Sequence, residues 1–218
     1  MEKELKFIVA DDDTVYPIGL INYLKTTCPG CVITEVKNGR EAVELLDREN
    51  YDFVLLDYLM PVMDGAEATK IIKQKKYDTK VIILSSVRDP IVLKAILDSH
   101  PDGYYLKDTS KAELKRAVEN IMAGKHFYSD EVIEIMVEHN SHFNSGKDVL
   151  SDAEWEVLLL KLGGVDQKKI SAMRHTSPET TKKHLHNIYD KLGNNPFTLT
   201  CYAVKHGRIK SLSFFTER

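Results

Sequence analysis

Cysteine is scarce in this chain, with three among 218 residues. An odd and sparse count argues against the disulfide framework that small secreted domains use. Cys28 and Cys31 have the spacing of a redox or half-zinc motif, but no second Cys or His pair lies near them, and the Pro-Gly between them indicates a turn. We therefore interpret them as small buried residues that flank a turn.

Long apolar runs are missing too. No stretch approaches the ~20 residues of a membrane span, and the first residues lack the apolar stretch of a signal peptide. Hydrophobic residues make up 43% and charged residues 29% of the chain, which argues against a disordered protein. We therefore expect a globular protein of the cytoplasm, with no membrane partner.

The net charge of −3 is unevenly distributed. Residues 147–218 carry 12 Lys and Arg against 8 Asp and Glu, whereas residues 1–146 carry 18 against 25. An acidic first part and a basic last part indicate different partners for the two. The basic excess is modest, and by itself it is a weak argument for nucleic acid.

The first ~125 residues alternate strand-like and helix-like patterns, which predicts a parallel sheet covered by helices. The strands are expected at Phe7–Ala10, Cys31–Val36, Phe53–Leu56, Val81–Leu84 and Tyr104–Leu106. The helices are expected at Val15–Thr27, with Thr14 as N-cap, and at Arg40–Glu49, Gly65–Lys75, Pro90–Ser99 and Lys111–Ala123. The fold class is therefore α/β, a five-stranded doubly wound parallel sheet over residues 1–124.

The rest of the chain shows no clear strand pattern. Residues 125–149 are rich in loop residues and are interpreted as a linker with one short helix, Glu131–Glu138. Residues 150–218 are expected to form a smaller all-α domain with a C-terminal tail. Its four helices are predicted at Asp152–Leu162, Gln167–Met173, Pro178–Leu192 and Thr198–His206.

Polar side chains stand at the ends of four predicted strands. They are Asp11 and Asp12, Asp57, Ser85 and Lys107. Ligands of open α/β sheets bind outside the carboxyl ends of the strands, so these five side chains could converge on one rim. Clustered carboxylates need a cation, and oxygen ligands suit Mg²⁺. An aspartate can hold a phosphoryl group, whose oxygens a lysine and a serine can bind.

These residues carry a resemblance to the receiver domain of response regulators, a flavodoxin-like fold. The run Asp57–Gly65 resembles the phosphoacceptor signature D-x-x-M-P-x-M-D-G, and Gly103–Asp108 is similar to the G-Y-x-L-K-D strand. The resemblance implies that Asp57 accepts a phosphoryl group from a sensor histidine kinase. It also implies that Mg²⁺ is held by Asp11, Asp12, Asp57 and the backbone carbonyl of Leu59. Ser85 and Lys107 would contact the phosphoryl group. Ser85 and Tyr104 would be switch residues, with Tyr104 turning inward on activation.

The third helix of the last domain has a polar and basic outer face. Ser177 is a good N-cap and Pro178 fits the first helical position. An inward stripe is formed by Thr181, Leu185, Ile188 and Leu192. Such a helix can enter the major groove of DNA, but its periodicity is equally typical of a solvated basic face.

Residues 150–206 resemble a LuxR-type helix-turn-helix of the NarL/FixJ class. The resemblance implies binding to duplex DNA, with bases read by Lys182, Lys183 and His186 and phosphates contacted by Thr180, Asn187 and Lys191; His184 belongs to the same motif. This sequence departs from the family pattern at Lys169, Arg174, Thr176 and Thr181. The tail also extends past the usual end, with Phe214 and Phe215 as candidates for docking.

The leading interpretation is a phosphorylation-dependent transcription regulator that pairs into a homodimer when active and catalyses only its own phosphorylation and dephosphorylation. The alternative is a phospho-switched protein whose altered C-terminal domain binds a protein partner. A hydrolase acting on an external substrate is disfavoured because no second set of nucleophile and base appears in the sequence.

Overall fold

The computed structural model describes residues 4–139 and 149–209. The chain divides into two compact units, Met1–Glu119 and Asn120–Arg218, and each is described by itself. The residues Phe214 and Phe215, which the sequence suggested for docking, lie outside the described residues. The predicted domain boundary at residues 124 and 125 stays a prediction.

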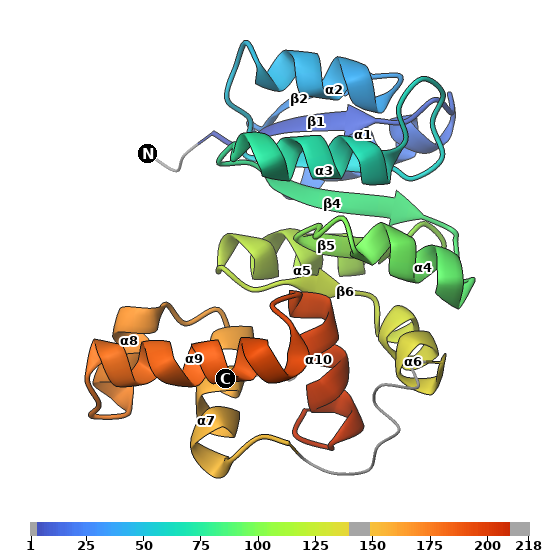
Figure 1. The fold of residues 1–218 in the computed structure, drawn as a ribbon. Helices are drawn as coiled ribbons and strands as arrows, with labels where there is room; N and C mark the ends of the chain where they lie inside the picture. The colour runs from blue at the N-terminus through green and yellow to red at the C-terminus, as the bar shows by residue number, and fades with distance from the viewer. Residues whose placement is uncertain (1–3, 140–148, 210–218) are drawn as a thin grey trace. The chain divides into compact units, whose positions relative to one another are not determined.

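The first unit is built on a parallel sheet, as expected (Figure 1). Its strands are β1 (Lys6–Ala10), β2 (Val32–Val36), β3 (Phe53–Asp57), β4 (Lys80–Ser85) and β5 (Gly103–Leu106). Its helices are α1 (Tyr16–Thr27), α2 (Gly39–Leu46), α3 (Gly65–Lys75), α4 (Pro90–Leu97) and α5 (Lys111–Met122), the last of which runs into the second unit. The order β2-β1-β3-β4-β5 is that of a doubly wound sheet.

The expected number of five strands was wrong by one. A sixth strand, β6 (Phe127–Tyr128), stands last in the order of the sheet, inside the segment that we interpreted as a linker. It is two residues long, and such a short apolar pair has no periodicity that could distinguish a strand from a loop.

The central strands are apolar because both of their faces are covered. Every residue of β3 is buried, and Ile8, Val54, Ala68 and Ile72 belong to the core between the sheet and helices α2 and α3. The register sets Ala10 of β1 beside Leu56 and Asp57 beside Leu84, so the carboxyl ends of these strands meet at one edge. The sheet thereby places the residues that follow its strands close together.

Helix caps explain where the helices of the first unit begin. The side chains of Asn38, Asp64 and Asp89 each accept a hydrogen bond from the first turn of the helix that follows. The expected N-cap of α1, Thr14, was wrong: the helix begins after Val15 and has no side-chain cap. Instead, the Asp13 carboxylate accepts a hydrogen bond from the backbone N–H of Val15 at 2.8 Å.

The second unit is helical apart from β6. It contains α6 (Asp130–His139), α7 (Asp152–Leu162), α8 (Gln167–Met173), α9 (Pro178–Leu192) and α10 (Pro196–Lys205). The bounds of α7, α8 and α9 are those predicted. Helix α10 begins two residues earlier than predicted because Asn195 caps it and Pro196 occupies its first turn. The core of the second unit includes Trp155, Val157, Leu185 and Ile188.

Within residues 4–139 and 149–209, no helix combines the length and the apolar character that crossing a membrane requires.

Candidate functional site

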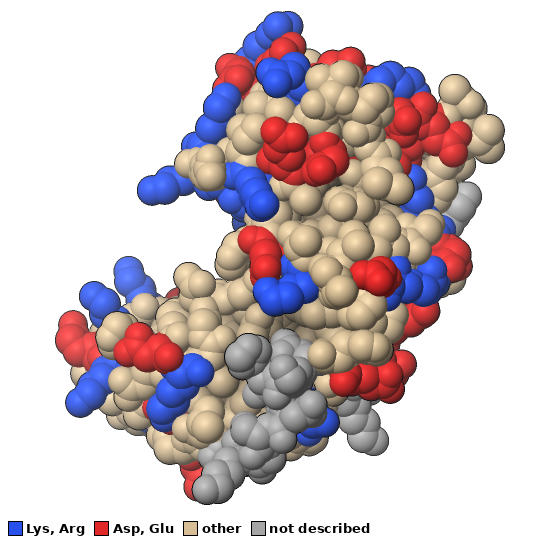
Figure 2. All heavy atoms as spheres, turned by 45° about the vertical axis from the view of Figure 1, so that its right-hand side comes forward, with Lys and Arg blue, Asp and Glu red and all other residues tan. Residues whose placement is uncertain are grey.

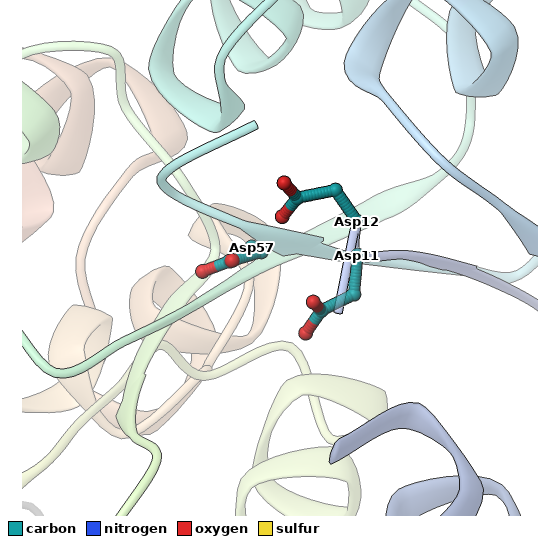
Figure 3. Close-up of side chains that lie close together, drawn as sticks. All are labelled: Asp11, Asp12 and Asp57. Atoms are coloured by element: carbon teal, nitrogen blue, oxygen red, sulfur yellow. The ribbon is translucent and has the colours of Figure 1, made fainter. Parts of the chain in front are cut away.

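Three carboxylates meet at the carboxyl edge of the sheet. Asp11 and Asp12 directly follow β1, and Asp57 is the last residue of β3. Figure 3 shows their side chains grouped at these strand ends, and one oxygen of each carboxylate lies within 4.8 Å of the others. Asp11 and Asp57 are buried, whereas Asp12 is exposed. Oxygen donors at this spacing fit a hard divalent cation such as Mg²⁺.

A glycine allows helix α3 to start beside Asp57. A Cβ atom built on Gly65 would lie 2.3 Å from the backbone oxygen of Asp57, so no other residue fits without moving the backbone. Gly65 N–H also donates to the carbonyl of Tyr58 at 3.0 Å. The glycine of the D-x-x-M-P-x-M-D-G run therefore has a packing role that fixes the loop carrying Asp57.

Lys107, which follows β5, neutralises part of the carboxylate charge. Its ammonium lies 2.9 Å from Oδ2 of Asp11 and 3.1 Å from Oδ2 of Asp57. Its side chain is only 16% exposed. Burial lowers the pKa of Lys107, but the hydrogen bonds and charges of Asp11 and Asp57 outweigh burial and raise it. Lys107 is therefore held charged against the two buried carboxylates.

The pKa of Asp57 is raised above its ordinary value. Burial is the main cause, the charge of Asp11 adds to it, and Lys107 opposes it. A carboxylate with poor solvation beside a second carboxylate is a stronger candidate for chemistry than a solvated surface aspartate.

Ser85 and Tyr104 lie on the neighbouring strands. Ser85, at the end of β4, is 2% exposed, and its Oγ accepts a hydrogen bond from the backbone N–H of Val87 at 3.1 Å. The Tyr104 ring is fully buried, and its hydroxyl donates to the carbonyl of Val87 at 3.0 Å. Burial raises the pKa of Tyr104 to about 12. Both side chains thus form a hydrogen bond with the backbone of Val87, in the loop between β4 and α4, and the Tyr104 ring points inward.

Two residues that the sequence did not single out also reach this site. The ammonium of Lys107 lies 4.5 Å from the ring centroid of Tyr16, the first residue of α1. Lys37 donates to the carbonyl of Asp13 at 3.1 Å and forms a 2.8 Å ion pair with Glu35. Neither the contact of Tyr16 with Lys107 nor that of Lys37 with Asp13 has a local signal in the sequence, because each depends on how the elements pack in the folded sheet.

Helix α9 presents the predicted outward face. Thr180, Lys182, Lys183 and His186 are exposed, and His184 and Asn187 are half-buried. Of the predicted inward stripe, Thr181, Leu185 and Ile188 are buried, and Leu192 is half-buried. His186 lies 3.3 Å from the carboxylate of Asp190, one turn further along the helix.

Lys191 pairs with a carboxylate on another helix, whereas His186 pairs within α9. Its ammonium lies 2.7 and 2.9 Å from the two carboxylate oxygens of Glu154 on α7. Glu154 also closes a capping box with Ser151 at the start of α7. A side chain expected to contact phosphates therefore also ties the last turn of α9 to α7.

The departures from the helix-turn-helix pattern have structural partners as well. Arg174 pairs with Glu156, at 3.1 Å from both Nε and Nη2. The fully buried Thr181 hydroxyl lies 3.0 Å from that of Ser171 and 3.2 Å from that of Thr176. Lys169 lies 3.6 Å from Asp166. The polar residues in this small core are thus mostly paired with one another.

The two spaced cysteines are less buried than expected. Cys28 and Cys31 are both free and half-buried at the turn between α1 and β2. Burial and the neighbouring Cys28 raise the pKa of the Cys31 thiol. A thiol with a raised pKa is a poor nucleophile at neutral pH, which agrees with a structural role.

Charges of both signs are interspersed over the face drawn in Figure 2, without a large patch of one sign on that face.

The site and the fold have clear counterparts among known proteins. Residues 7–119 match the family described as the response regulator receiver domain, and residues 148–200 match the bacterial regulatory proteins of the luxR family. The chain is 32% identical to the response regulator protein VraR of Staphylococcus saprophyticus over 208 residues, which cover 94% of this chain and 99% of the relative. VraR of Staphylococcus aureus is 33% identical over the same coverage.

Solved structures agree with these matches. An RcsB response regulator of Salmonella typhimurium covers 90% of this chain and 97% of its own, with 25% identity and a TM-score of 0.58. The receiver domain of a NarL response regulator of Mycobacterium tuberculosis covers 56% of this chain, with 29% identity and a TM-score of 0.52. The chain belongs to the two-component response regulators, in the class that joins a receiver domain to a LuxR-type helix-turn-helix.

Proposed function

We propose that Asp57 is the phosphoacceptor of this regulator and that its phosphorylation controls DNA binding by the second unit. The observation that carries the first part is the geometry of the acidic site. Asp57 shares one buried ammonium, that of Lys107, with Asp11. The proposed phosphodonor is a sensor histidine kinase or a small acyl phosphate, and the proposed location is the cytoplasm, where such donors and DNA occur.

Each residue at the site has its own proposed role in phosphoryl transfer. An oxygen of the Asp57 carboxylate attacks phosphorus while the bond from phosphorus to the donor breaks, and the donor leaves with that electron pair. Lys107 and Ser85 bind the oxygens of the transferred group. Asp11, Asp12, Asp57 and the backbone carbonyl of Leu59 are proposed to hold Mg²⁺, which supplies positive charge for the phosphoryl oxygens when bound. We propose two reactions for the chain: its own phosphorylation and the hydrolysis that transfers the phosphoryl group from Asp57 to water.

The proposed output is DNA binding through α9. Lys182, Lys183 and His186 are exposed, and we propose that they read base edges. Thr180, Asn187 and Lys191 are proposed to contact phosphates. The same fold occurs in an RcsB protein solved in complex with DNA, with a TM-score of 0.58 and 24% identity. Phosphorylation would shift the population toward a state with the DNA-binding unit available, as a homodimer.

The phosphoacceptor is tested by intact mass after incubation with acetyl phosphate and Mg²⁺. The wild type should gain one phosphoryl group, and Asp57→Asn should gain none. Asp12→Ala is expected to require more Mg²⁺ for the same rate while the fold persists. A phosphoryl gain that survives in Asp57→Asn would remove Asp57 from its role.

A protein partner is the second candidate for the output. It is favoured by the interspersed charges in Figure 2 and by the polar substitutions at Arg174, Thr176 and Thr181. Selection of duplexes from a random pool separates the two candidates. Binding to DNA should show a steep dependence on salt, whereas a protein partner leaves no duplex enriched.

A further inference from the structure

The ring of Tyr16 lies against the catalytic lysine. The ammonium of Lys107 is 4.5 Å from the Tyr16 ring centroid, well within the ~6 Å at which a cation and an aromatic face attract each other. Tyr16 comes from the start of α1 and Lys107 from the end of β5, so the contact joins two distant parts of the sequence. Tyr16 is half-buried.

Lys107 therefore has three neighbours that fix its ammonium: the carboxylates of Asp11 and Asp57 and the ring of Tyr16. A lysine has four rotatable bonds in its side chain and is otherwise strongly hydrated, so it loses considerable freedom when it is held at a site. Both Tyr16 and Lys107 line a cavity of about 180 Å³ between α1 and α5, into which an unrestrained lysine could move.

We propose that Tyr16 is a positioning residue, whose ring holds the Lys107 ammonium over the phosphoacceptor. The inference rests on the proposed function of Asp57 and Lys107. The ring adds attraction for a cation without adding a negative charge to a site that already has three carboxylates. It also covers the ammonium, which strengthens the interactions of the lysine with phosphoryl oxygens. A third carboxylate partner in the same place would instead compete with those oxygens.

A substitution series separates the ring from the hydroxyl. Tyr16→Phe and Tyr16→Trp keep an aromatic face for the cation, whereas Tyr16→Leu keeps apolar bulk without one. Tyr16→Leu should lower the rate constant for phosphorylation by acetyl phosphate about three- to tenfold, while Tyr16→Phe and Tyr16→Trp stay within about twofold of wild type. Ile18→Ala, on the same helix at a 59% exposed position outside this cavity, is the control and should change nothing.

Two further readouts distinguish positioning from damage to the site. The Mg²⁺ concentration for half-maximal rate should be the same in all variants, because the carboxylates are left in place. In Mg²⁺-free protein, the ε-methylene protons of Lys107 should show a ring-current shift in proton NMR in the wild type and in Tyr16→Phe. Tyr16→Leu should lose this shift, while the rest of the spectrum keeps the dispersion of a folded receiver.

The outcomes keep the two claims apart. If the wild type gains no phosphoryl mass on Asp57, the proposed function fails, and the NMR shift still decides whether the ring holds Lys107. If the wild type is phosphorylated but Tyr16→Leu reacts at the wild-type rate, the inference about Tyr16 is overturned alone. A loss of rate equally large in Tyr16→Phe would assign the effect to the hydroxyl and overturn the ring as its cause.

Discussion

Glu154 is a buried residue of the second unit whose ionisation affects stability. Although burial acts to raise its pKa, the hydrogen bonds from Lys191 and Ser151 outweigh burial and lower the pKa from 4.5 to about 2. Because the folded pKa lies below the unfolded value, the carboxylate stabilises the fold above pH 4.5. That contribution, on the order of 3 kcal/mol, is lost as the pH falls toward 2.

We therefore predict that unfolding of this unit depends on pH through Glu154. Urea unfolding can be followed by fluorescence of Trp155, the single tryptophan of the chain, which neighbours Glu154. Between pH 6 and pH 3.5 the wild type should lose about 1.4 kcal/mol more than Glu154→Gln does. Equal losses in the two proteins would show that the carboxylate of Glu154 is not the group responsible.

Because Lys191 pairs with Glu154, a substitution of Lys191 tests the stability of the second unit as well as DNA binding. From the sequence, loss of Lys191 should only weaken binding to every duplex and flatten the salt dependence. Since its ammonium lies on Glu154, Lys191→Ala should also lower the free energy of unfolding, by roughly 1–3 kcal/mol. Lys182→Ala is the control, because Lys182 is exposed and should change DNA affinity alone.

At the scale of elements, the hydroxyl groups of Ser171, Thr176 and Thr181 form a network of hydrogen bonds at the turn between α8 and α9. The Thr181 hydroxyl lies within hydrogen-bond distance of those of Ser171 and Thr176. Removing the Thr181 hydroxyl leaves Thr176 without this partner, whereas Ser171 keeps its hydrogen bond to the carbonyl of Gln167 at 2.9 Å. Removing all three hydroxyls leaves no member of the network without its partner.

We therefore predict that these substitutions are not additive. Thr181→Val should destabilise the unit by about 1 kcal/mol. The triple variant Ser171→Ala, Thr176→Val, Thr181→Val should be as stable as the wild type or more so. Chemical denaturation of the single and combined variants gives the coupling directly, and strictly additive losses would contradict a shared network.

Elements with strong local signals were predictable, and so was the convergence of residues at the strand ends, whereas other side-chain contacts between distant residues were not. Helix α9 follows from the Ser177 cap, the Pro178 start and its 3–4 periodicity, all of which are local. The start of α1 was wrong because Asp13, not Thr14, supplies the side chain that bonds to the N-terminal turn. The strand ends brought Asp11, Asp57 and Lys107 together as the topology requires.

Tyr16 and Lys37 were missed because their roles depend on side-chain packing. Nothing in the sequence near Tyr16 indicates that its ring lies against a lysine 91 positions later, since α1 and β5 meet only in the folded sheet. Lys37 likewise reaches Asp13 from a different strand. Motifs identify single residues, whereas these two contacts depend on how elements distant in the sequence pack together.

At the scale of the whole molecule, an acidic part (residues 1–146) and a basic part (residues 147–218) share one chain, and the remaining prediction concerns the coupling of the phosphoacceptor to DNA binding. Phosphorylation should raise affinity for a selected duplex at least tenfold, which corresponds to about 1.4 kcal/mol of difference between the two states. The gain should vanish in Asp57→Asn, while that variant keeps the basal affinity of the unphosphorylated wild type.

Titrations at several salt concentrations assign the source of that gain. If phosphorylation pairs two chains on the duplex, the number of phosphate contacts rises and the dependence of affinity on salt becomes steeper. Light scattering should then report a larger mass for the phosphorylated protein at the same concentration. If affinity rises with an unchanged salt dependence and an unchanged mass, phosphorylation instead makes the α9 face of a single chain available. If affinity does not change at all, the acidic site controls an output other than DNA binding, and the protein-partner candidate takes its place.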